Sequence, residues 1–226
     1  MEFEKIVEII ESRREALKSR EEEIEVVDYG AGSPRDKRTK EEMEKGVVCK
    51  ISLQNLAKIG VKREKAQEIL KIFKNLNPKV ILELGTCCGF SSSYMSYFAQ
   101  NSRIYTIEGS ESVAEIAREN HKEFGLLNIE VLVGRFELVL PTLLERIAPL
   151  DFAFIDGHHD KFATWKYFHS IRPFMRKGGV MLFDDIAWSD GMQDAWEEIT
   201  KELKESKCKE VSIVGCDAWK MGVVWL

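Results

Sequence analysis

Short apolar runs alternate with longer amphipathic stretches between Lys79 and Glu205. The five runs span residues 80–82, 104–107, 129–133, 152–155 and 179–183. Short runs without polar alternation are typical of parallel strands that are buried on both faces. Helical periodicity fills the intervals, at about 91–100, 112–124, 136–147, 162–175 and 191–205. This alternation predicts a doubly wound α/β domain, with helices on both faces of a mostly parallel sheet.

The C-terminal segment departs from that alternation. Val211–Val214 and Met221–Trp225 are further apolar runs, and only a short loop separates them. Because no helix fits between them, we expect the two runs to pair as an antiparallel hairpin. The sequence therefore predicts a seven-stranded sheet that ends in this hairpin. Such an order differs from the two repeated halves of a dinucleotide-binding dehydrogenase.

The first 76 residues carry helical patterns that lie outside the sheet. Residues 1–22 place an apolar stripe on one helix face, and residues 61–76 predict another helix. Between them, two glycines, a serine and a proline predict a loop over 26–34. Thr39 with Glu42 predicts the capping box of a further helix.

We therefore divide the chain into an N-terminal helical extension, residues 1–76, and a main domain, residues 77–226. A helix outside the sheet must bury its apolar stripe somewhere. We expect the extension to form a lid over a ligand site or the contact of a homodimer.

Composition restricts the classes of partner. The 226 residues carry a formal net charge of −5 at pH 7, which argues against nucleic acid. No apolar run approaches the roughly 20 residues that span a bilayer, and no apolar signal core follows the N-terminus, so we expect a cytoplasmic protein without a membrane partner.

The cysteine spacing fits neither a zinc framework nor a disulfide set, so we expect reduced thiols. The five are Cys49, Cys87, Cys88, Cys208 and Cys216.

A glycine-containing loop follows the first run of the sheet. Gly85 and Gly89 allow a tight turn and a close approach to a ligand. Cys87 stands where the dinucleotide fingerprint requires its second glycine, so that pattern fails. Glu108 closes the second run 23 positions after Gly85, where an acid can accept hydrogen bonds from both ribose hydroxyls. Phosphate affinity is not needed if the ligand is a nucleoside that carries an amino acid.

Glu83–Ser91, together with Glu108, resembles the ligand motif of the class I S-adenosylmethionine-dependent methyltransferases. Within them the chain is most similar to the catechol-type O-methyltransferases, because Asp151–His159 and Lys177–Asp185 extend the match. The resemblance covers residues 79–226 and implies a Rossmann-like methyltransferase fold. Asp28–Ser33 also looks like a segment of uncharacterised bacterial and archaeal members and is not a catechol-type feature.

The resemblance implies S-adenosylmethionine as cofactor and distributes its parts along the chain. The glycine loop would hold the methionine part, the end of the second strand the ribose, and the end of the third strand the adenine. Asp156 would face the sulfonium and the substrate. The implied cofactor-binding residues are Glu83, Gly85, Thr86, Cys87, Gly89, Ser91, Glu108, Gly109, Gly134, Arg135, Phe136 and Asp156.

Three carboxylates follow the fourth and fifth strands of the sheet, namely Asp156, Asp184 and Asp185. Their mutual repulsion calls for a cation or a proton, and an all-oxygen set favours Mg²⁺ or Ca²⁺. Catechol-type enzymes bind a divalent cation at the matching positions with two aspartates and an asparagine. Here Asp185 stands in place of that asparagine, and its extra negative charge either strengthens the metal site or marks a different use. The resemblance implies Mg²⁺ on these three aspartates, and helix capping or a hydrogen bond to cofactor or backbone is the alternative.

His159 lies three residues after Asp156, where the catechol-type base is a lysine. Neutral imidazole takes a proton near pH 7 without a large pKa shift, so we expect Asp156 and His159 to be catalytic. The alternative is a loop histidine that positions the substrate or Asp156.

The sequence thus predicts an S-adenosylmethionine-dependent methyltransferase that acts on a hydroxyl of a small molecule, with possible help from a divalent cation. Metal-independent methylation of nitrogen or carbon is the alternative. A nicotinamide-dependent dehydrogenase lacks support because the Gly-x-Gly-x-x-Gly pattern is absent. A non-catalytic cofactor-binding protein would more readily have lost the acids at the strand ends.

Overall fold

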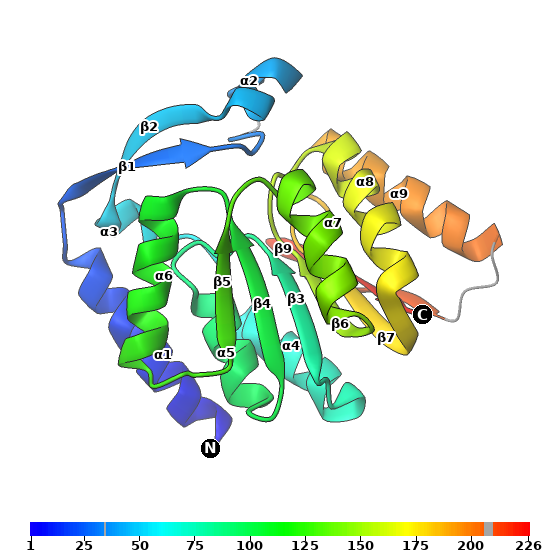
Figure 1. The fold of residues 1–226 in the computed structure, drawn as a ribbon, viewed down its shortest axis with the longest axis horizontal. Coiled ribbons are helices and arrows are strands. Elements are labelled where there is room, and N and C mark those ends of the chain that lie inside the picture. The colour runs from blue at the N-terminus through cyan, green and yellow to red at the C-terminus, as the bar shows by residue number, and fades with distance from the viewer. Residues whose placement is uncertain (34, 206–209) are drawn as a thin grey trace.

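The computed structural model describes residues 1–33, 35–205 and 210–226, and its centre is a seven-stranded sheet (Figure 1). The strands lie in the order β5-β4-β3-β6-β7-β9-β8. Their bounds are β3 (Val80–Leu84), β4 (Arg103–Glu108), β5 (Ile129–Val133), β6 (Leu150–Ile155), β7 (Met175–Phe183), β8 (Glu210–Cys216) and β9 (Trp219–Trp225). β3 to β7 pair in parallel, whereas β9 is antiparallel to both β7 and β8. The predicted sheet and its terminal hairpin are confirmed.

Alternate residues of the strands face two separate cores, because successive side chains of a strand point to opposite faces. Ile81 belongs to the core under α1 (Phe3–Lys18), α4 (Arg63–Leu76), α5 and α6, and Leu82 to the core under α7, α8 and α9. Both faces of the sheet are therefore covered, which is why its strands read as uninterrupted apolar runs. The helices of the main domain are α5 (Phe90–Phe98), α6 (Glu111–Glu123), α7 (Phe136–Ile147), α8 (Lys161–Ile171) and α9 (Asp190–Glu205). The helix predicted to reach residue 175 ends at Ile171, where the 3₁₀ turn η1 (Arg172–Phe174) follows.

The N-terminal extension contains strands as well as helices. Its elements are α1 (Phe3–Lys18), β1 (Glu23–Asp28), α2 (Lys40–Lys45), β2 (Val47–Ser52), α3 (Leu53–Leu56) and α4 (Arg63–Leu76). β1 and β2 form an antiparallel pair of their own, with Val26 opposite Cys49. The expectation of a loop from residue 26 is therefore wrong through Asp28, and a purely helical extension is wrong too. The predicted capping box of Thr39 and Glu42 is present at α2. Pro34, within the expected loop, lies outside the described residues.

Arg14 fixes α1 to the rest of the extension. Its side chain is fully buried and donates hydrogen bonds to the backbone carbonyls of Ala57, Ile59 and Val61. The guanidinium also lies 4.0 Å from the ring centroid of Phe90, at the start of α5. A buried cation with these acceptors holds the α3–α4 connection in place, and α4 is the helix that reaches the site described below.

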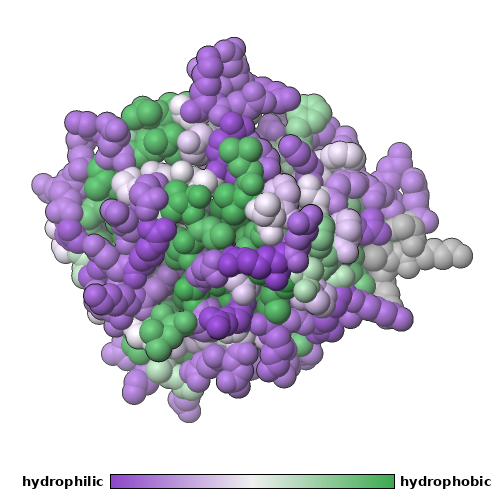
Figure 2. Space-filling model, in the orientation of Figure 1, coloured by the Kyte–Doolittle hydropathy of each residue, from purple (hydrophilic) through white to green (hydrophobic). Residues whose placement is uncertain are grey.

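Most of the face in Figure 2 is hydrophilic, with hydrophobic residues gathered near its centre. None of the described helices has both the length and the apolar character that a bilayer span requires. Cys49, Cys87, Cys88 and Cys216 are free thiols, as expected, whereas Cys208 lies outside the described residues.

Candidate active site

A cavity of about 350 Å³ opens at the carboxyl ends of the parallel strands, between those strands and the β1–β2 pair. Ligands of open α/β sheets bind at this edge. Every site residue predicted from the sequence lines the cavity, except Glu83 and Gly89. The lining residues among them are Gly85, Thr86, Cys87, Ser91, Glu108, Gly109, Gly134, Arg135, Phe136, Asp156, His159, Asp184 and Asp185.

Gly85 and Gly89 are required by the backbone of the loop itself. Gly85 has φ +97°, and a Cβ there would lie 2.1 Å from the carbonyl oxygen of Asp156. Gly89 has φ +74° and is the N-cap of α5, where a Cβ would meet His121 Nε2 at 2.5 Å. Both positions thus exclude a side chain. Gly85 lets the loop after β3 run against the loop after β6, and this contact brings Asp156 to the cavity.

Glu108 presents its carboxylate to the cavity from the end of β4. Oε2 accepts the backbone N–H of Cys87 at 2.9 Å, and Oε1 accepts that of Ser110 at 3.0 Å. Burial raises the pKa of this carboxyl, and the backbone hydrogen bonds oppose the rise. A carboxylate oxygen has room for a second donor beyond the one that it already binds. The group is therefore placed to accept hydrogen bonds from two neighbouring hydroxyls.

Glu83 lies fully buried beneath the loop and is absent from the cavity lining. Its Oε2 accepts a hydrogen bond from Thr106 Oγ1 at 2.6 Å, while Oε1 has no hydrogen-bond partner among the described residues. Burial raises the pKa of Glu83 to about 8, against the hydrogen bonds that lower it. A buried acceptor without a donor is costly. This unpaired acceptor lies beneath the glycine loop, outside the cavity lining, and its chemistry suits the ammonium of the amino acid in the cofactor that the sequence implies.

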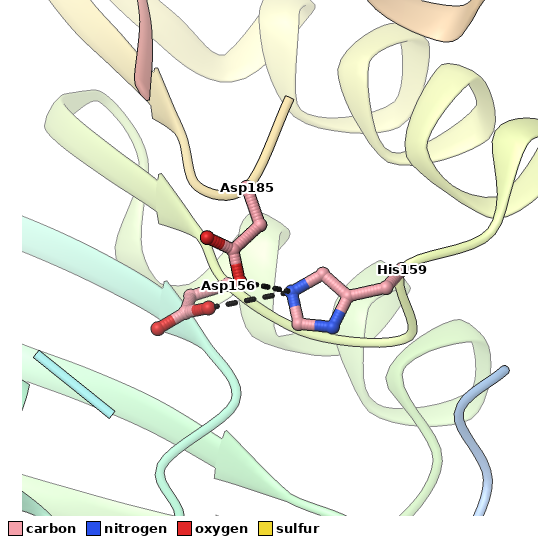
Figure 3. A group of neighbouring side chains, drawn as sticks. All are labelled: Asp156, His159 and Asp185. Atoms are coloured by element: carbon pink, nitrogen blue, oxygen red, sulfur yellow. Dashed lines mark ion pairs between the residues drawn. The ribbon is translucent and has the colours of Figure 1, made fainter. Parts of the chain in front are cut away.

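The side chains of Asp156, His159 and Asp185 converge (Figure 3), and all three residues line the cavity. His159 Nε2 lies 3.5 Å from Asp156 Oδ1 and 3.9 Å from Asp185 Oδ2. Burial lowers the pKa of His159, but the hydrogen bond and charge of Asp156 and the charges of Asp185 and Asp184 outweigh it, so the pKa is raised. The imidazole of His159 therefore lies beside both carboxylates.

Asp184 and Asp185 both reach the site because β7 has already ended at Phe183. Within a strand, adjacent side chains would point to opposite faces. Asp185 instead has φ +50°, a left-handed conformation that turns its side chain to the same side as that of Asp184. Asp184 and Asp185 could converge only if the strand had ended before them, and the structure shows both the end of the strand and the convergence.

Lys65, from the first turn of α4, stands between these two carboxylates. Its Nζ donates to both oxygens of Asp184 at 2.7 Å and to Asp185 Oδ1 at 2.9 Å. Burial lowers the pKa of Lys65, but Asp184, Asp185 and Asp156 outweigh it and raise the pKa above its ordinary value. Sequence reasoning missed this residue. A signal exists, because Lys65 shares the helical stripe of the buried residues Ile69, Ile72 and Leu76.

The predicted Mg²⁺ set is divided by this lysine. Both oxygens of Asp184 are bound to Lys65, so in this arrangement Asp156, Asp184 and Asp185 do not fit one shared cation. Asp156, His159 and Asp185 do offer ligand atoms that all lie within 4.8 Å of one another. That group contains an imidazole nitrogen, which Mg²⁺ rarely takes as a ligand.

The N-terminal extension supplies the remaining wall. Val27, Asp28, Tyr29 and Gly30 line the cavity. The backbone N–H of Ala31 donates to the carbonyl of His158 at 2.7 Å. The sequence marks this segment by its glycines and by its resemblance to uncharacterised proteins, and in the structure it lines the cavity.

Comparison with known proteins agrees with this geometry. Residues 82–186 match a family described as a methyltransferase domain. The catechol O-methyltransferase of Sus scrofa is 30% identical over 130 residues, 56% of this chain and 70% of that protein. That of Bos taurus is 27% identical over 149 residues, 63% of this chain and 55% of that protein. The chain thus spans little more than half the length of the bovine relative.

The solved O-methyltransferase from Bacillus cereus, in complex with SAH, has a TM-score of 0.63 at 23% identity, and the match covers 76% of this chain and 85% of that one. At that identity the likeness shows the fold. Together with the 30% identity to the pig protein, it means that the chain belongs to the class I S-adenosylmethionine-dependent methyltransferases, among the O-methyltransferases.

Proposed function

We propose that this chain transfers the methyl group of S-adenosylmethionine to a hydroxyl of a small molecule. The observation that carries the proposal is the imidazole of His159, held beside Asp156 in the same cavity that Glu108 and the glycine loop line. The names of the relatives, catechol O-methyltransferases, support oxygen as the acceptor atom.

Binding and alignment fall to the acids at the strand ends. When bound, S-adenosylmethionine supplies an electrophilic methyl group, whose S–C bond breaks as the O–C bond to the acceptor forms, and the sulfur keeps the electron pair. Glu108 accepts hydrogen bonds from the ribose hydroxyls, and Glu83 Oε1 is the free acceptor for the amino group. Alignment of nucleophile and methyl group is the main rate contribution available to such a site.

His159 takes the proton that leaves the acceptor hydroxyl. Its Nε2 is buried and faces Asp156 Oδ1 at 3.5 Å, so a proton on this nitrogen is held between the imidazole and the carboxylate. Asp156 and Asp185 stabilise the imidazolium that forms. The indole of Trp188 lies 6.4 Å from the imidazole, centroid to centroid, and is 48% exposed, so it offers an apolar wall for the acceptor. Mg²⁺ has no part in this proposal.

The test is a panel of phenols, catechols and aliphatic alcohols, each paired with the matching amine, and the readout is S-adenosylhomocysteine release and product mass. Hydroxyl acceptors should react. His159→Gln should slow turnover about 100-fold, the scale of general-base catalysis, without a change in S-adenosylhomocysteine affinity. His169→Gln is the control, because His169 pairs with Glu202 at α9, away from the cavity. Methylation of amines alone would favour the alternative of N-methylation.

A further inference from the structure

We infer that the ammonium of Lys65 is a built-in cation that takes the place of a divalent metal ion between Asp184 and Asp185. This role makes Lys65 a positioning residue for the acceptor end of the cavity. It also means that methyl transfer by this chain needs no added metal. The statement about turnover rests on the proposed function, whereas the statement about metal binding does not.

The first support is the way in which Asp184 is used. The Asp184 side chain is only 3% exposed, and both of its oxygens accept hydrogen bonds from Lys65 Nζ at 2.7 Å. Mg²⁺ binds carboxylate oxygens at about 2.0–2.1 Å and demands nearly octahedral geometry. An ion on Asp184 would therefore lie against the ammonium of Lys65, and the two positive charges would repel one another. In this arrangement the buried carboxylate is already satisfied by charge-assisted hydrogen bonds.

The second support is charge. Asp156, Asp184 and Asp185 place three acids at one end of the cavity, and close carboxylates repel one another strongly in a buried site. Lys65 bridges two of them, and His159 lies between Asp156 and Asp185. Each acid thus has a cationic or protonatable neighbour from within the chain. The repulsion that first suggested a metal is relieved without one.

The third support is where the lysine comes from. Lys65 lies on α4, before the residues that match the methyltransferase family, 82–186. Its Nζ nevertheless lines the same cavity as Asp156 and His159, because α4 packs against the sheet through Ile69, Ile72 and Phe73. The ammonium therefore comes from a helix of the N-terminal extension, and the main domain, residues 77–226, does not supply it. An ammonium in this position keeps Asp184 and Asp185 fixed at the end of the cavity where the acceptor is proposed to bind, and its field favours negative charge there.

The decisive measurement is Mn²⁺ binding. It is detected in electron paramagnetic resonance as a loss of the signal of free Mn²⁺. Wild-type protein should bind no Mn²⁺ at the cavity. Lys65→Ala removes the ammonium and leaves its space, so this variant should gain one Mn²⁺ site per chain, and Lys65→Ala/Asp184→Asn should lose it again. Lys62→Ala, an exposed lysine at the start of the same helix, is the matched control and should behave as wild type.

Binding of S-adenosylhomocysteine, measured by calorimetry in each variant, reports an intact fold without any acceptor. If Lys65→Ala does not fold, Lys65→Ser serves in its place. One Mn²⁺ bound to the wild type and lost in Asp184→Asn would overturn the inference, because the lysine would then yield to a metal. A Lys65 variant that folds and gains no site would overturn it as well, because something other than Lys65 would be keeping the metal out.

Turnover supplies the second arm once an acceptor is found. The wild type should keep its full rate after exhaustive chelation, and Lys65→Met should lose about 100-fold in kcat, the scale of a removed electrostatic donor. Complete loss of wild-type activity on chelation would overturn the inference. Failure to bind S-adenosylhomocysteine would contradict the proposed function instead, and the Mn²⁺ result would still decide the role of Lys65.

Discussion

The carboxylate of Glu108 accepts the backbone N–H of Cys87 at 2.9 Å, which ties the end of β4 to the glycine loop after β3. The same carboxylate lines the cavity. One side chain therefore both shapes the loop and offers acceptors to a ligand, and replacing it should affect binding through both routes.

Glu108→Ala should weaken S-adenosylhomocysteine binding strongly. Each hydrogen bond to a charged group contributes about 1.5–3 kcal/mol, so the loss of even one such bond means roughly a 10- to 100-fold rise in Kd. Isothermal titration calorimetry measures this rise. Glu115→Ala, an exposed glutamate of α6, is the control. Equal affinities in Glu108→Ala and wild type would show that the ribose does not contact this residue.

Glu83 should release a proton when an amino-acid-bearing ligand binds. Its pKa of about 8 leaves it mostly protonated at pH 7 in the free protein. An ammonium beside Oε1 favours the charged carboxylate and lowers that pKa, so the proton departs into the buffer. Calorimetry of S-adenosylhomocysteine in buffers of different ionisation enthalpy should detect up to one proton per site.

Adenosine lacks the amino acid and should release no proton from Glu83. Glu83→Gln should abolish the release for S-adenosylhomocysteine, since an amide does not titrate. The same buffer dependence with adenosine, or its persistence in Glu83→Gln, would contradict the assignment of this carboxyl to the amino group.

His159 should titrate with a pKa above its ordinary value. Its pKa is raised because Asp156, Asp185 and Asp184 outweigh the effect of burial. The neutral form that can accept a proton therefore predominates only above that raised pKa, and turnover should increase as the pH rises through it. Asp156→Asn removes the strongest stabilising partner, so burial should then dominate and the pKa should fall. Nitrogen-15 NMR of the imidazole follows both titrations, with His159→Gln to identify the signal. An unchanged or higher pKa in Asp156→Asn would refute this account.

The sheet could be predicted from the sequence because its strands are buried on both faces. Phe152, Ala153 and Phe154 are all inaccessible to solvent, so no polar residue interrupts their run. The β1–β2 pair gave no comparable signal. Its residues Val48, Cys49 and Lys50 are exposed, and the partners are joined by a long connection that contains α2. The pairing of β1 with β2 depends on tertiary contacts, so the local sequence pattern does not reveal it.

The part of the site that could be predicted from the sequence consists of residues at the carboxyl ends of the parallel strands. Glu108 ends one strand, Asp156 and Asp185 follow two others, and all three strands open on one edge, so topology alone brings these residues together. Lys65 was missed because it approaches from a helix, 119 positions before Asp184 in sequence. Its place among Ile69 and Ile72 indicates that it is buried, but only the packing of α4 on the sheet determines which acid it meets.

The last prediction concerns the contact between Gly109 and Tyr29, which joins the end of β4 to the N-terminal extension. A Cβ at Gly109 would lie 2.7 Å from the Tyr29 ring. Gly109→Ala should therefore push Tyr29 away from the cavity and raise the Kd for S-adenosylhomocysteine, by about tenfold if 1.4 kcal/mol of contact is lost. Tyr29→Ala should have a similar effect. If both act by opening one lid, the double variant should be no worse than either single one, because residues in contact are not additive. Fully additive losses in calorimetry would show that the two residues contact the ligand independently and that the extension does not close over it as a lid.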